Sequence, residues 1–107
     1  MKIQINTGKN LTVHAEYGNE LEALLKKELS RYSEHITRLE VHLSDENGTK
    51  ESLNDKKCLL EARLEGRQPL AVSASSNTYD QAVNSAVGKL KALLDTIIGK
   101  LRDFHKD

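Results

Sequence analysis

Side chains that could do chemistry are few and scattered in this sequence. The four histidines, His14, His35, His42 and His105, have spacings that match no metal-binding motif. The single cysteine, Cys58, falls at an apolar position of an alternating segment, which is typical of a buried structural thiol. No nucleophile elbow, phosphate-binding loop or dinucleotide glycine motif is present. We therefore predict that the protein is not an enzyme and uses no metal or cofactor.

Lysine and arginine side chains near the end of the sequence are the remaining candidates for a binding function. Lys89 and Lys100 share one flank of an apolar helical stripe, and Lys91 and Arg102 share the other flank. Such cations can bind phosphates, although the pattern alone favours an ordinary solvated helix. The chain has 16 basic and 16 acidic residues and a formal net charge of zero, whereas nucleic-acid binders are usually basic. Binding to RNA would therefore depend on local clusters of cations.

The alternation of polar and apolar residues predicts four strands. A period of two is typical of a strand with one buried and one solvated face. Asn47-Gly48, between the second and third of these segments, favours a hairpin turn. A second turn is expected from Gly66 to Pro69. The predicted strands cover residues 2–6, 36–44, 56–65 and 70–74.

Two segments have the hydrophobic period of an amphipathic helix. The first starts between residues 15 and 20 and ends near Ser33, with Asn19 and Glu22 as a candidate capping box. The second opens with Thr78 and Gln81, which form a T-x-x-Q capping box, and runs to about Asp103. The apolar face of the first helix carries Leu21, Leu25, Leu29 and Tyr32.

The predicted element order is β-α-β-β-β-α, and this order defines the fold class. Because polar and apolar residues alternate along each strand, one face of the sheet is apolar and must be covered. Two helices suffice to cover one face. We therefore predict one α+β domain over residues 1–107, a two-layer sandwich in which a four-stranded sheet carries both helices on one face. The stripe centred on Leu90 should pack against Leu39, Val41, Cys58, Leu60 and Val72.

The sequence also carries expectations about where the protein works. Its first residues alternate and do not form the apolar run of a signal peptide, and no apolar stretch reaches the ~20 residues of a membrane span. A single cysteine cannot form an internal disulfide. We expect a cytoplasmic protein without a membrane partner.

Three segments, taken in order, resemble one known family. They are the opening KIQINTGKN, the segment YSEHITRLEVHL at residues 32–43 and the helix opening TYDQAVNSAVGKL at residues 78–90. Together they resemble the ribosome hibernation-promoting factor and ribosome-associated inhibitor (sigma-54 modulation protein) family in its short form. The similarity covers nearly the whole chain, and the predicted element order matches.

The resemblance implies a fold similar to double-stranded RNA-binding domains and a function in translation. Such a protein would bind the small ribosomal subunit during stress or stationary phase and block the path of mRNA and tRNA, without a cofactor or a small-molecule substrate. Basic residues of both helices would contact phosphates of ribosomal RNA. By position and flank, the candidate RNA-binding residues are Lys26, Lys27, Arg31, Lys89, Lys91, Lys100 and Arg102.

An alternative hypothesis is a divergent member that binds a protein partner or associates with itself. Where the family has a cationic run in the last helix, this sequence has Ala92, Thr96, Ile97 and Ile98. Apolar side chains could then form a contact beyond the core, either Ile97, Ile98 and Phe104 on the helix or Leu59 on the solvated face of the sheet. Ordinary core and edge packing is the simpler explanation of these residues.

Overall fold

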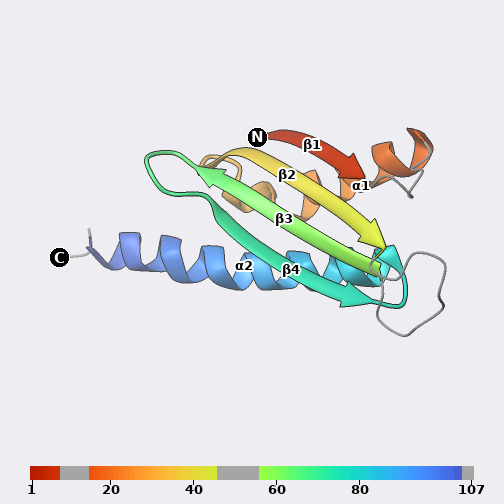
Figure 1. The fold of residues 1–107 in the computed structure, drawn as a ribbon. Helices are drawn as coiled ribbons and strands as arrows, with labels where there is room; N and C mark the ends of the chain where they lie inside the picture. Colours follow the sequence, from red (N-terminus) through yellow and green to blue (C-terminus); the bar gives the residue numbers. More distant parts are fainter. Residues whose placement is uncertain (8–14, 46–55, 105–107) are drawn as a thin grey trace.

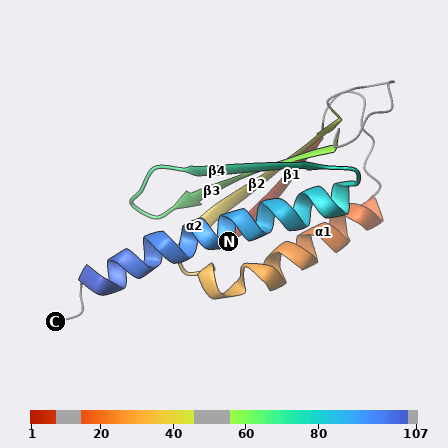
Figure 2. The ribbon, with the colours of Figure 1, turned by 90° about the horizontal axis from the view of Figure 1, so that it is seen from below.

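A four-stranded sheet is covered on one face by two long helices (Figures 1 and 2). The computed structural model describes the backbone of residues 1–7, 15–45 and 56–104, and side chains within these ranges except those of residue 15 and residues 100–104. The elements, in order, are β1 (Lys2–Thr7), α1 (Ala15–Glu28), the short 3-10 helix η1 (Ser30–Tyr32), β2 (Ile36–Asp45), β3 (Lys56–Leu64), β4 (Leu70–Ser76) and α2 (Tyr79–Phe104). The predicted α+β fold and its element order are thus confirmed.

The strands lie in the order β1-β2-β3-β4. β1 pairs with β2 in parallel, whereas β2–β3 and β3–β4 pair antiparallel. A parallel pair needs a crossover, and α1 supplies it between β1 and β2. The sheet is therefore mixed, with β1 and β4 at its edges.

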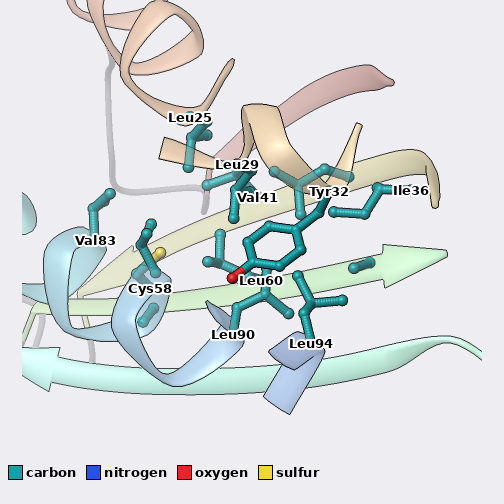
Figure 3. Packing of buried hydrophobic residues seen from close by; sticks show 14 of the residues in the cluster. Leu25, Leu29, Tyr32, Ile36, Val41, Cys58, Leu60, Val83, Leu90 and Leu94 are labelled. Atoms are coloured by element: carbon teal, nitrogen blue, oxygen red, sulfur yellow. The ribbon is translucent and has the colours of Figure 1, made fainter. Parts of the chain in front are cut away.

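The core lies between the sheet and the helix layer, by which we mean α1, η1 and α2. Successive strand residues point to opposite faces, so one face of β2 and β3 is buried and the other partly solvated. Leu90 of α2 is fully buried against this face, as predicted. Figure 3 shows side chains of both helices meeting those of the strands. The largest fully buried side chains are Leu25, Leu29, Ile36, Leu39, Val41, Leu43, Cys58, Leu60, Val83, Leu90 and Leu94.

A bulge in β2 departs from the strict alternation predicted for residues 36–44. Ile36 pairs with Leu64 and Arg38 with Arg63, so Thr37 is an extra residue in the ladder. The bulge turns Ile36 into the core, where only 1% of it is exposed. The hydroxyl of Thr37 donates to the carbonyl oxygen of Arg63 at 3.2 Å and holds the bulge against β3.

The first helix begins earlier than its predicted capping box. α1 starts at Ala15, so Asn19 lies inside it and cannot be the N-cap, and Glu22 pairs instead with Lys26 at 3.1 Å. The helix also ends before Ser33, because the chain tightens into η1, where the N–H of Tyr32 donates to the carbonyl of Leu29. Both corrections concern the boundaries of the helix and not its buried face.

The N-cap role of Thr78 in the second predicted capping box is confirmed. The hydroxyl of Thr78 accepts a hydrogen bond from the N–H of Gln81 at 3.1 Å, which satisfies one of the free donors at the start of α2. The turn at Gly66 is also confirmed, and this glycine has a φ of 71°, a conformation that other residues rarely adopt. The Asn47-Gly48 turn lies outside the described residues.

Candidate nucleic-acid interface

Five predicted RNA-binding residues with described side chains all lie in the helix layer. Lys26 and Lys27 are exposed in the last turn of α1, and Arg31 is exposed in η1. Lys89 is exposed and Lys91 half-buried, both on α2. The predicted Lys100 and Arg102 belong to the backbone of α2, but their side chains are outside the described part of the structure.

The two flanks of α2 face in different directions. Lys91 reaches α1, where its ammonium lies 3.0 Å from the carboxylate of Glu28. Lys89 reaches the sheet edge, where its ammonium donates to the backbone carbonyl of Ser73 in β4 at 2.8 Å. Lys91 therefore belongs to the seam between the two helices, and Lys89 does not.

Polar contacts along this seam show that α1 and α2 run parallel. The hydroxyl of Tyr17 donates to Asp80 at 3.2 Å, and Glu28 pairs with Lys91. The partner lies 63 positions further along the chain in both contacts, and a constant offset of this kind requires helices that run in the same direction. Figure 2 shows α1 and α2 side by side in this arrangement.

The third contact of the seam joins two groups to one carboxylate. The hydroxyl of Tyr32 donates to Asp95 at 2.6 Å, and the guanidinium of Arg31 pairs with the same oxygen. Burial and the hydrogen bond to Asp95 raise the pKa of Tyr32, so this phenol stays a donor. The guanidinium of Arg31 also lies 4.9 Å from the ring centre of Tyr32, within the range of a cation–π contact.

A cavity of about 290 Å³ opens beside Arg31. Its lining is mostly polar and brings η1 next to the second half of α2. His35, which precedes β2, also lines it, so two residues with nitrogen-bearing side chains border this cavity. The lining residues are Arg31, Tyr32, His35, Asp95, Ile98 and Gly99.

The cations of the helix layer are largely satisfied within the chain. Lys26, Arg31, Lys89 and Lys91 each contact an oxygen of the protein. Among the described residues, Lys27 has no such partner. Sequence reasoning identified the cations and missed the acceptors, Glu28 and Asp95, because that pairing depends on the helix register.

The described residues show no cluster that would favour catalysis or metal binding. Burial raises the pKa of the Cys58 thiol to about 12, so the nucleophilic thiolate is suppressed near neutral pH. No three histidine, cysteine or acidic side chains in the described ranges come together to hold a metal ion. His42 lies 3.9 Å from Glu61 on the open face of the sheet. That pair is an isolated contact between neighbouring strands.

Comparison with known proteins defines first the fold and then the family. The N-terminal domain of Protein Y from Thermus thermophilus superposes with a TM-score of 0.71 at 20% identity, covering 91% of this chain and 99% of that one. A ribosomal subunit interface protein from Coxiella burnetii gives a TM-score of 0.71 at 18% identity, covering 92% and 99%. These identities establish the shared fold alone. A comparison with curated protein sequences gave no match.

The family follows from the sequence match. Residues 4–102 match the family described as sigma 54 modulation protein / S30EA ribosomal protein. This match spans nearly the whole chain, and the chain belongs to that family. The resemblance inferred from the sequence is thus confirmed. In the described part of the structure, neither helix combines the length and apolar character needed to cross a bilayer.

Proposed function

We propose that this protein binds the small ribosomal subunit through its helix layer and regulates translation by blocking the path of mRNA and tRNA under stress. The family match over residues 4–102 carries this proposal, because the family description names a ribosomal protein. The Coxiella burnetii neighbour, a ribosomal subunit interface protein, points the same way. Such a protein acts in the cytoplasm, where ribosomes are.

The position of the family-matched cations, and not the net charge of either face, favours the helix layer as the side that meets RNA. On the open face of the sheet, Glu40 of β2 and Glu61 of β3 stand directly opposite each other in the antiparallel register. Two carboxylates at the centre of this face would repel phosphates. The helix layer instead presents Lys26, Lys27 and Arg31 as exposed cations close together in the chain, and these can donate to phosphate oxygens.

Occlusion requires only a folded body held in place. The molecule measures 56 × 25 × 20 Å, so a copy held in the RNA path would be large enough to obstruct a strand of RNA. Cations of the helix layer supply the attachment, and the sheet supplies the bulk. No bond is made or broken, which fits the suppressed thiol of Cys58.

Binding to the small subunit should weaken as salt rises, because each phosphate contact releases counterions. If three to five cations contact phosphates, the slope of log affinity against log salt should be about −2 to −4, at roughly 0.7–0.9 per contact. Co-sedimentation with isolated small subunits at several salt concentrations measures this slope, with large subunits as the control. Binding that does not respond to salt, or that is equal for the two subunits, would contradict the proposal.

A specific observation supports the alternative of a protein partner or a second copy. Ile97 is only half-buried, and it lines an open hollow of about 780 Å³ with the turn residues Gly66 to Pro69 and with Leu70 at the start of β4. Figure 2 shows that this half of α2 extends beyond the sheet. An apolar side chain on a protruding helix suits a protein contact. Salt-insensitive binding in the same experiment would favour this alternative.

A further inference from the structure

Up to Gly99, where the described side chains end, the helix layer carries no excess of basic residues. From Glu16 to Gly99 its three helices carry five cations and six anions. The cations are Lys26, Lys27, Arg31, Lys89 and Lys91, and the anions are Glu16, Glu20, Glu22, Glu28, Asp80 and Asp95. Apart from Lys27, each cation with a described side chain on this surface must leave an internal partner before it can bind RNA.

We propose that Glu28 and Asp95 act as internal competitors of RNA phosphates by holding Lys91 and Arg31. On this view, these two carboxylates lower the affinity of the helix layer for RNA. The inference rests on the proposed function, since it concerns the strength of the same contact. It adds a specific role for two acidic residues that motif reasoning did not identify.

Asp95 is suited to this role because the core holds it in place. Its carboxylate accepts a hydrogen bond of 2.6 Å from Tyr32, whose side chain is almost completely buried. The side chain of Arg31, in contrast, is 71% exposed. The guanidinium can therefore turn towards an incoming phosphate, while the negative charge of Asp95 stays where it is.

An incoming phosphate has room beside Arg31. The cavity of about 290 Å³ next to this side chain is also lined by His35 and Asp95. A phosphate that enters it comes close to Arg31 and His35, but also to the negatively charged Asp95. Because exposed charges act over about 8 Å at physiological salt, this carboxylate opposes the anion throughout its approach.

Glu28 acts in the same way on the neighbouring cation of the seam. Its carboxylate lies 3.0 Å from the ammonium of Lys91. The side chains of Lys91 and Glu28 are 35% and 37% exposed. Lys91 would have to leave Glu28 to contact RNA. Ion pairs with this degree of exposure are weak, so such an exchange is feasible but reduces the net gain.

Removing the two competing charges should strengthen binding to RNA. In the double variant Glu28→Gln/Asp95→Asn, both positions keep an oxygen acceptor, and the new amide in α2 can still accept from the hydroxyl of Tyr32. We expect binding to a short fluorescent RNA duplex to tighten by about fivefold for each released cation. The salt dependence should also become steeper, by roughly 1.4 to 1.8 in the log–log slope.

A matched control separates the release of cations from a change in overall charge. Glu16→Gln/Glu20→Gln removes the same number of charges from the exposed side of α1, where neither carboxylate has a cation partner among the described residues. If the control tightens binding as much as the test variant, or if neither variant tightens it, the inference is wrong. Unfolding curves of both variants confirm that they are folded.

The same variants tested on small ribosomal subunits separate this inference from the proposed function. Suppose that the wild type binds the subunit, but the test variant binds neither the RNA duplex nor the subunit better than the control does. The inference then fails and the proposed function stands. If the wild type does not bind the subunit but the test variant gains RNA affinity as expected, the function fails and the competition by Glu28 and Asp95 stands.

Discussion

Reversing the charges of Lys27 and Arg31 together should weaken binding to the small ribosomal subunit by at least about tenfold, which corresponds to about 1.4 kcal/mol. Both side chains are exposed at the end of α1 and in η1, so each can reach a phosphate. Glutamate at these positions removes two attractive contacts and adds repulsion. The salt slope should become shallower by roughly 1.4 to 1.8. Co-sedimentation or fluorescence anisotropy measures both quantities.

The matched control lies on the other face of the sheet. Lys2 and Arg63 are exposed, and both share a row across the sheet with Arg38 of β2. Lys2→Glu/Arg63→Glu therefore changes the net charge by the same amount, and Arg38 can pair with the new carboxylates. We expect this variant to bind the subunit almost as well as the wild type. If the control lost more affinity for the subunit than the test variant, the RNA-facing surface would be the sheet and not the helices.

Replacing Leu90 with alanine should destabilise the protein by about 2–5 kcal/mol, because the site is fully buried and the lost methyl groups leave a cavity. Leu90 lies in the middle of α2, with Leu60 of β3 and Leu94 nearby (Figure 3). The two layers that enclose the side chain limit how far the core can collapse into the cavity. Urea unfolding followed by circular dichroism measures the loss.

Leu93 provides the comparison on the same helix. It is half-buried, so Leu93→Ala creates no enclosed cavity, and its loss should be clearly smaller, below about 2 kcal/mol. Equal losses at the two positions would contradict the orientation of α2. A loss below about 0.5 kcal/mol for Leu90→Ala would place this residue at the surface, where substitutions have effects of that size.

The core could be predicted from the sequence because hydrophobic period is a local property. Strands repeat every two residues and helices every 3.6, so Leu39, Val41 and Leu60 identify one sheet face and Leu90 identifies the helix that covers it. The bulge at Thr37 could not be predicted in this way, because an extra residue in β2 depends on how β2 pairs with β3. Ile36 is buried for that reason, although regular alternation would place it on the polar face of the strand.

The candidate interface could be predicted only in part. Sequence pattern and family resemblance identified the cations, and the structure places those with described side chains in the helix layer. Pairing of Arg31 with Asp95, or of Lys91 with Glu28, depends on the relative direction and register of two helices more than 60 residues apart. No local pattern contains that register. Which cations pair with a carboxylate could therefore not be predicted from the sequence.

A bound copy of the protein should exclude RNA from the small subunit, and a competition measurement tests this most directly. Small subunits are loaded with a fluorescent mRNA fragment, and the protein is added in increasing amounts while anisotropy is followed. We expect the fragment to be displaced in step with occupancy of the subunit by the protein, and we expect the Lys27→Glu/Arg31→Glu variant to need at least about ten times more protein. Subunits that carry the protein and the full amount of mRNA fragment at the same time would contradict blocking of the RNA path.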